Sequence, residues 1–368
     1  MRFSDVLDIR NGRNQRQVEN ENGKYPIYGS GGVIGHADNF ICDAETVVIG
    51  RKGSINNPIF VDEPFWNVDT AFGLVANKEV LLPKYLYYFC VNYNFEQLNT
   101  TVTIPSLTKA NLLQIEIRVP DMDIQQNIVN VLDKICYLID VRRKELYSLD
   151  QLVKSRFIEL FGDPDVNSKG WNECALSEKL NVVGGYAFKS DQFDEERGIP
   201  VLRIGNINAG FFRPVNLVYW HEDESLERYI VYPGELVMSL TGTVGKDDYG
   251  NVCILGDDYG KYYLNQRNAK LEIVEGIDKY YLSQLLKFEQ IKKRLTGISR
   301  GVRQANISNK DILNLVVPVP PMEIQEQFSA FVAQTDKSKY YSQKFLTLCR
   351  SAANIYEQEW MKCQTLNF

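Results

Sequence analysis

The sequence predicts an α+β (α/β-like) protein with two similar, mainly sheet-containing domains separated by two long antiparallel helices. Three observations support this fold class: an internal repeat, short apolar runs bounded by turn residues, and two extended helical segments. The predicted boundaries are 1–122 for the first sheet domain, 123–162 for the first long helix, 163–321 for the second sheet domain and 322–362 for the second long helix.

The repeat is clearest where residues 107–126 (LTKANLLQIEIRVPDMDIQQ) and 307–326 (ISNKDILNLVVPVPPMEIQE) align without a gap. A weaker similarity precedes it, between Tyr25-Pro26-Ile27 and Ile199-Pro200-Val201. Two repeats of about 200 residues each are too few and too long for a solenoid. It indicates one fold present twice, with pseudo-twofold symmetry.

Short apolar runs with neighbouring Gly, Asn, Asp and Pro predict strands and turns in each repeat. Examples are Thr46–Gly50 (TVVIG) and Leu236–Leu240 (LVMSL). Helical patches are expected around 81–98 and 278–296. Each repeat therefore predicts a domain that is mainly sheet.

The first long helix follows Pro120, which cannot donate a hydrogen bond within a sheet. Its apolar residues alternate at spacings of four and three, a heptad seam with one interruption at Arg142. Gly162 and Pro164 are expected to end it. The predicted seam residues of this helix are Ile128, Leu132, Ile135, Ile139, Leu146, Leu149 and Val153.

The second long helix follows Pro320-Pro321 and is less regular, with Phe328, Val332 and Leu346 as its predicted seam residues. A helix of about 36 residues is roughly 54 Å long, whereas a domain of about 130 residues has a radius of gyration of about 14 Å. We therefore expect the two helices to pack on each other. The alternative is that each lies on its own domain.

Composition excludes several classes of protein. The seven cysteines contain no C-x-x-C pair, and there are only two histidines, so neither a disulfide framework nor a metal site is expected. No stretch approaches the roughly 18 apolar residues of a membrane-spanning helix. The first residues lack the charged-then-apolar layout of a signal peptide. We expect a cytoplasmic protein with no membrane contact.

Motifs for catalysis are incomplete. The run Gly29–Gly35 has Ile34 where a dinucleotide-binding loop needs glycine, and Gly245-Lys246 is followed by Asp247 rather than by Ser or Thr. Asn57-Pro58-Ile59-Phe60 differs by one residue from the Asn-Pro-Pro-Tyr/Phe motif of DNA adenine methyltransferases. We therefore expect no catalytic residues and no enzyme activity in this chain.

The net charge is −6, but basic residues gather locally. Residues 287–303 hold six basic residues against one acidic residue, and residues 10–16 hold three arginines. Such clusters suit DNA phosphates and base edges, although a solvated basic face is the alternative. The predicted DNA contacts are Arg10, Arg13, Arg16, Arg51, Lys52, Lys246, Arg267, Arg300 and Arg303, with Gln304 as a base-reading residue.

Several strings resemble the DNA-specificity subunit of type I restriction–modification systems. Their order along the chain and their duplication make this resemblance specific. Those strings are Tyr25–Gly35 (YPIYGSGGVIG), Thr46–Gly53 (TVVIGRKG), Phe157–Pro164 (FIELFGDP), Ile199–Asn206 (IPVLRIGN) and Val317–Gln325 (VPVPPMEIQ). The resemblance covers essentially the whole chain.

The resemblance implies two target-recognition domains that each read one half of a split double-stranded DNA sequence. It also implies that the long helices form a spacer on which two methyltransferase subunits dock. Those partners would bind S-adenosylmethionine, and a separate restriction motor–nuclease subunit would use ATP and Mg²⁺. This chain would bind no cofactor itself.

Two other functions fit parts of the sequence. One is a coiled-coil scaffold or adaptor whose two sheet domains bind proteins. The other is a self-sufficient DNA methyltransferase, which would have to bind its cofactor in this chain.

Overall fold

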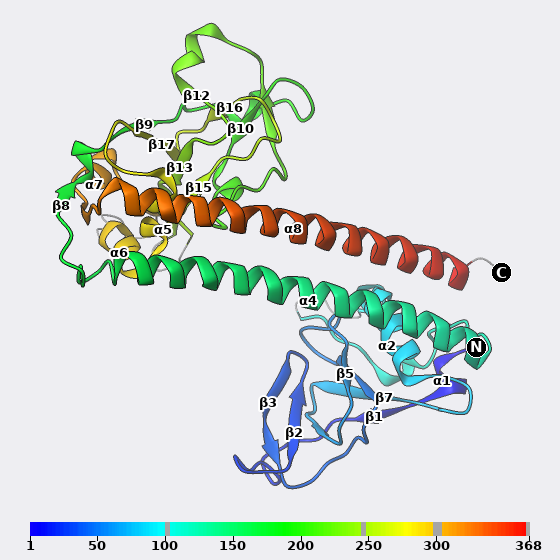
Figure 1. The fold of residues 1–368 in the computed structure, drawn as a ribbon. Helices are drawn as coiled ribbons and strands as arrows, with labels where there is room; N and C mark the ends of the chain where they lie inside the picture. The colour runs from blue at the N-terminus through cyan, green and yellow to red at the C-terminus, as the bar shows by residue number, and fades with distance from the viewer. Residues whose placement is uncertain (100–103, 244–247, 297–303, 366–368) are drawn as a thin grey trace. The chain divides into compact units, whose positions relative to one another are not determined.

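The computed structural model describes residues 1–99, 104–243, 248–296 and 304–365. The chain divides into two compact units. Unit 1 comprises Met1–Lys144 with Ser342–Phe368, and unit 2 comprises Glu145–Tyr341. Two long helices, α4 (Met122–Phe161) and α8 (Met322–Thr365), each contribute to both units (Figure 1).

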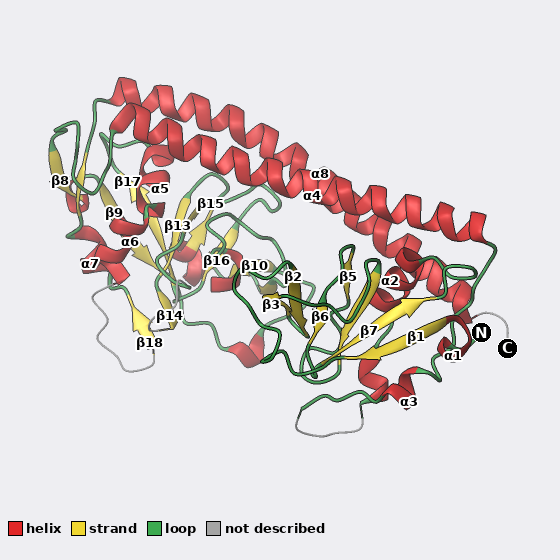
Figure 2. Ribbon diagram, turned by 90° about the horizontal axis from the view of Figure 1, so that it is seen from below, coloured by secondary structure: helices red, strands yellow, loops and turns green. Residues whose placement is uncertain are grey.

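Unit 1 contains two sheets. The first has the order β1-β7-β4-β5 with antiparallel neighbours, and the second has the order β3-β2-β6. Helix α2 packs against the first sheet (Figure 2). The elements before α4 are α1 (Phe3–Val6), β1 (Leu7–Asn11), β2 (Tyr25–Gly29), β3 (Gly32–Ala37), β4 (Thr46–Gly50), β5 (Ile59–Val61), β6 (Trp66–Asn67), β7 (Ala71–Ala76), α2 (Pro83–Asn92), the 3₁₀ turn η1 (Phe95–Leu98) and α3 (Lys109–Leu112).

Unit 2 has corresponding sheets with the orders β9-β17-β13-β15 and β11-β10-β16-β12, and two further strand pairs, β8–β19 and β14–β18. Its strands are β8 (Glu173–Ala175), β9 (Leu180–Gly184), β10 (Ile199–Leu202), β11 (Val218–Trp220), β12 (Ile230–Val231), β13 (Leu236–Ser239), β14 (Thr241–Thr243), β15 (Val252–Ile254), β16 (Tyr262–Leu264), β17 (Asn268–Ile273), β18 (Gln304–Asn306) and β19 (Val316–Pro318). Its helices are α5 (Lys279–Lys287), α6 (Glu289–Thr296) and α7 (Asn309–Leu313), with 3₁₀ turns η2 (Leu176–Glu178), η3 (Ser190–Gln192), η4 (Ile204–Asn206) and η5 (Glu224–Tyr229).

The strand orders confirm the duplication. The order β1-β7-β4-β5 in unit 1 matches β9-β17-β13-β15 in unit 2, with antiparallel pairing throughout. The second sheets each contain one parallel pair, β2–β6 and β10–β16. The predicted α+β fold with an internal repeat is therefore confirmed.

Two equivalent glutamines show how closely the repeats agree. Gln125 and Gln325 are fully buried at the starts of the long helices. Gln125 Oε1 accepts a hydrogen bond from Leu82 N at 2.9 Å, and its Nε2 donates to Pro120 O at 2.8 Å. Gln325 likewise accepts from Asp278 N at 2.8 Å and donates to Pro320 O at 2.7 Å. Each amide joins a long helix to the loop before a domain helix.

Within each unit, segments of α4 and α8 lie side by side and run antiparallel. In unit 2, Lys339 pairs with Asp150 at 2.7 Å, and the Phe328 ring packs against Phe157 with centroids 5.5 Å apart. In unit 1, the guanidinium of Arg142 lies 4.8 Å from the centroid of the Phe345 ring. The predicted interruption of the seam is therefore occupied by a cation–π contact.

The ten predicted seam residues are all at least half-buried. The buried ones are Leu132, Val153, Phe328, Val332 and Leu346, and the half-buried ones are Ile128, Ile135, Ile139, Leu146 and Leu149.

The end of α4 lies where the sequence predicts it. Gly162 has φ +78°, which permits the turn after the helix, and its N–H donates to Ile158 O at 2.8 Å. Among the described residues, no helix is both long enough and apolar enough to cross a membrane.

Candidate nucleic-acid interface

Both units gather loops at one edge of the second sheet. Because the carboxyl ends of parallel strands meet at the same edge, the loops after β2 and β6 are neighbours in unit 1. The loops after β10 and β16 are neighbours in unit 2. We call these loop clusters the reading edges of the two units.

The reading edge of unit 1 is held together by backbone hydrogen bonds. Arg13 N donates to Asn67 O at 2.9 Å, and Arg51 N donates to Thr70 O at 2.8 Å. Gly12 approaches so closely that a Cβ on it would lie 1.8 Å from Val68 O. The loops after β1 and β4 therefore meet the segment after β6.

Four of the predicted DNA contacts lie in these loops with exposed side chains: Arg13, Arg16, Arg51 and Lys52. The indole of Trp66 donates to Arg13 O at 2.9 Å, which fixes the backbone of that loop. The guanidinium of Arg51 lies 5.7 Å from the centroid of the Phe72 ring, which orients it without neutralising its charge. This edge can therefore present fixed positive charge to an anionic polymer.

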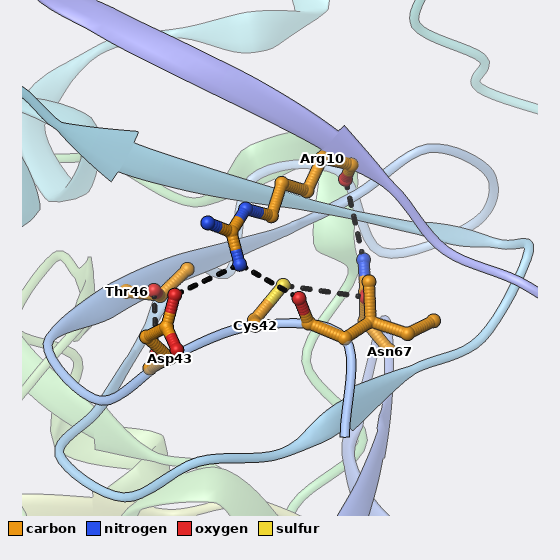
Figure 3. Close-up of polar contacts among 6 residues, drawn as sticks. Arg10, Cys42, Asp43, Thr46 and Asn67 are labelled. Atoms are coloured by element: carbon orange, nitrogen blue, oxygen red, sulfur yellow. Dashed lines mark hydrogen bonds and ion pairs between the residues drawn. The ribbon is translucent and has the colours of Figure 1, made fainter. Parts of the chain in front are cut away.

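Arg10 differs from these four because protein groups already bind its guanidinium (Figure 3). Its Nη1 donates to Ile41 O at 2.8 Å and to Asp43 Oδ2 at 2.9 Å. Beneath it, the Cys42 thiol donates to Asn67 Oδ1 at 3.4 Å, and burial raises the pKa of this thiol to about 12. Arg10 thus joins β1 to the loop before β4, and DNA contact by this residue stays a prediction.

The reading edge of unit 2 has the equivalent backbone connections. Tyr186 N donates to Leu264 O, and Leu240 N donates to Arg267 O, both at 2.8 Å. The loops enclose a pocket of about 640 Å³. The residues that line it are Phe188, Ser190, Phe193, Arg203, Ile204, Gly205, Asn206, Arg213, Val215, Asn216, Asn265, Gln266 and Arg267.

The structure thus brings Arg267, which the sequence predicted, together with Arg203 and Arg213, which it did not. Arg203 directly follows β10, in the string IPVLRIGN of the repeat. Its place after a strand with a counterpart in the first repeat was a signal that could have identified it. Arg213 carries no such signal because only the folding of the loop brings it to the pocket.

In the basic segment 287–303, two of the four basic residues that the structure describes form ion pairs. The Arg294 guanidinium pairs with Asp165 at 2.8 Å, and Lys293 pairs with Glu289. Lys292 is buried and donates to Asn251 Oδ1 at 2.7 Å. The local sequence charge therefore overstates the free positive charge of α6.

Four predicted contacts lie outside the described structure: Lys246, Arg300, Arg303 and the side chain of Gln304. In the part of the chain that is described, no three His, Cys, Asp or Glu side chains are arranged to hold a metal ion.

Comparison with known proteins agrees with this architecture. Residues 1–151 and 168–344 match the family described as the type I restriction modification DNA specificity domain. The type I restriction enzyme MjaVIII specificity subunit of Methanocaldococcus jannaschii is 25% identical over 316 residues, which cover 80% of this chain and 70% of the relative.

Two solved structures share the fold. The S subunit of a type I restriction–modification system from M. genitalium aligns with a TM-score of 0.67 and 17% identity, over 97% of this chain and 94% of that one. A chain from a structural study of complex assembly and conformational transition in the type I system aligns with a TM-score of 0.50 and 15% identity, over 98% and 96%.

Proposed function

Because the chain belongs to the type I restriction–modification DNA specificity family, we propose that its two units read the two halves of a bipartite DNA target. The observation that carries this proposal is the duplicated reading edge. Each unit presents loops from equivalent strands at the same edge of its second sheet. The exposed arginines come from different loops, after β1 and β4 in unit 1 and after β10 and β16 in unit 2. One fold present twice suits two half-sites of different sequence.

The chemistry of these edges suits double-stranded DNA. Guanidinium groups bind phosphates and the O6 and N7 atoms of guanine, and amide side chains bind adenine. Unit 1 offers Arg13, Arg51 and Lys52, and unit 2 offers Arg267 with Asn265 and Gln266 beside it.

We further propose that α4 and α8 position two adenine methyltransferase subunits and set the gap between the half-sites. Each helix contributes residues to both units, and the proposal predicts that a change in helix length alters the gap. In a restriction complex, motor–nuclease subunits would join the assembly. The chemistry would belong to these partners, with S-adenosylmethionine on the methyltransferases and ATP with Mg²⁺ on the motor, and this chain would be non-catalytic.

The test is to express this chain with and without its methyltransferase partner and to map methylated adenines by single-molecule sequencing. We expect a split methylated sequence only when both proteins are present. Methylation by the isolated chain, with crosslinking of S-adenosylmethionine to it, would instead indicate a self-sufficient methyltransferase. Co-purification with proteins but no effect on methylation would indicate a scaffold.

A further inference from the structure

We infer that Arg203, Arg213 and Arg267 form a grip for a backbone phosphate of the DNA half-site read by unit 2, and that Asn206 is the residue that positions it. This inference rests on the proposed function and deepens it. It assigns a phosphate-binding role to the pocket at the reading edge of unit 2.

The pocket collects positive charge in a chain that is acidic overall. Its three arginines come from two loops, the one after β10 and the one after β16. None of the described residues that line it is acidic, whereas the whole chain carries a net charge of −6. The electrostatic potential inside it therefore favours an anion.

Asn206 holds the loop that carries two of these arginines. It is 2% exposed, and its Oδ1 accepts a hydrogen bond from Arg203 N at 2.9 Å. Its Nδ2 donates to Arg213 O and to Val215 O, both at 2.9 Å. Arg213 N in turn donates to Asn206 O at 2.9 Å. One buried amide thus ties together both ends of the loop from 203 to 215.

The arginines are positioned but are not neutralised. Arg203 donates from Nη2 to Asn216 O, a neutral carbonyl, so its full charge remains. The guanidinium groups of Arg213 and Arg267 form no hydrogen bond or ion pair with any residue that the structure describes. By contrast, Arg294 of the same unit is paired with Asp165. These three side chains are therefore available to a ligand.

A phosphodiester fits this arrangement better than a base edge alone. Guanidinium groups bind phosphate oxygens through two parallel hydrogen bonds, and an anion on the sheet edge would be reached by arginines from both loops. The amides of Asn216, Asn265 and Gln266 line the same pocket and could then contact neighbouring base edges. Unit 1 also presents exposed arginines, on its loops after β1 and β4, as a ligand with many phosphates would require.

The experiment uses the full chain in complex with its methyltransferase partner and a duplex that carries the mapped target. We compare the wild type with the triple variant R203A/R213A/R267A over a range of salt concentrations. Affinity should fall by at least about tenfold. The slope of log K against log salt should flatten by about 0.9 for each phosphate that the variant no longer binds. The preference for the half-site of unit 1 should not change.

Two further variants separate positioning from folding. N206D keeps the acceptor for Arg203 N but loses both donors, so it should weaken binding and flatten the salt slope even where the thermal midpoint of the complex is retained. The matched control is R228A, which removes an exposed guanidinium of unit 2 that does not line the pocket. Its affinity and slope should match the wild type.

Each outcome has a separate meaning. If the wild-type complex shows no sequence preference, the proposed function fails. If the wild type is specific but the triple variant keeps its affinity and slope, only the phosphate grip is overturned. Should the triple variant not fold, R203K/R213K/R267K retains the charge without the bidentate geometry, and wild-type binding by it would also overturn the grip. Displacement of DNA by adenosine monophosphate beyond its ionic-strength effect would indicate a nucleotide pocket instead.

Discussion

The indole Nε1 of Trp360 donates a hydrogen bond of 3.2 Å to the hydroxyl of Tyr85, and the two ring centroids lie 5.2 Å apart in an edge-to-face arrangement. Trp360 lies near the end of α8, whereas Tyr85 lies on α2 in the first repeat. In unit 2, the equivalent Tyr281 packs against Phe157 and Phe161 near the end of α4. The core of each unit is thus completed by the end of the long helix of the other repeat.

W360A should destabilise unit 1 by about 3–5 kcal/mol, because truncation of a buried tryptophan removes apolar packing and leaves a cavity. Trp360 is 7% exposed. Hydrogen exchange followed by mass spectrometry is the measurement, with loss of protection expected in β1, β7 and α2. The strands of unit 2 should keep their protection.

The matched control is Y85F, which keeps the ring packing and removes only the hydroxyl. That hydroxyl also donates to Arg118 O at 3.0 Å, so we expect a cost of about 1 kcal/mol. An equal loss of stability in W360A and Y85F would contradict a role for ring packing.

Gln125 and Gln325 give a second prediction with an internal control. Replacement by leucine leaves buried backbone groups unpaired, which should cost about 1–3 kcal/mol in each case. Q125L should lower the protection of backbone amides from hydrogen exchange in unit 1, and Q325L should lower this protection in unit 2. Q126L, at the exposed neighbour of Gln125, should change the free energy of unfolding by less than about 0.5 kcal/mol. If either buried variant matched Q126L, the clamping role of that amide would be wrong.

The sequence predicted the long helices, the duplicated sheets and the aligned glutamines because each leaves a periodic or repeated pattern. It could not predict contacts between distant residues. Arg294 and Asp165 are 129 residues apart, so the sequence showed a basic run where the structure has an ion pair. Arg203, Arg213 and Arg267 likewise meet only because strands β10 and β16 pair in parallel.

The buried thiols predict a pH dependence. Burial raises the pKa of Cys42 and of Cys253 from an ordinary value of 9.0 to about 12 in each case. Folding therefore favours the protonated thiols. Their stabilising contribution to the free energy of unfolding is fully present below pH 9. It is lost between about pH 9 and 12, because the unfolded chain then ionises while the folded chain does not.

Alkylation at pH 8.5 with mass spectrometry tests the state of these thiols. Cys136 is exposed and should be modified first, while Cys42 and Cys253 should be modified only as fast as the protein opens. Addition of urea should make all three react alike. Rapid alkylation of Cys42 in the folded protein, without urea, would show that its thiol is not buried beneath Arg10.

The reading edge of unit 1 gives a prediction that complements the phosphate grip of unit 2. R51A/K52A should relax or weaken recognition of one half-site only, because both side chains lie on the loop after β4. Loss of a bidentate base contact costs about 1–3 kcal/mol, whereas loss of a phosphate contact weakens all sequences alike. Methylome mapping distinguishes the two. The control is K78A, an exposed lysine of the same unit that pairs with Glu45.

Lengthening both long helices tests whether they set the gap between the half-sites. Seven added residues are about two helical turns, so an insertion after Lys144 in α4 and another after Tyr341 in α8 preserves the faces that pack. Each helix gains about 10.5 Å, which is about three base pairs at 3.4 Å each. Methylome mapping should then show a longer gap between two unchanged half-sites.

The control for this prediction is the same insertion in α4 alone. Helix pairs such as Asp150 with Lys339 would then lose their register, so we expect less methylation rather than a new gap. Recovery of the original gap from the double insertion would contradict the spacer role, because the distance between the half-sites would then be set by something other than helix length.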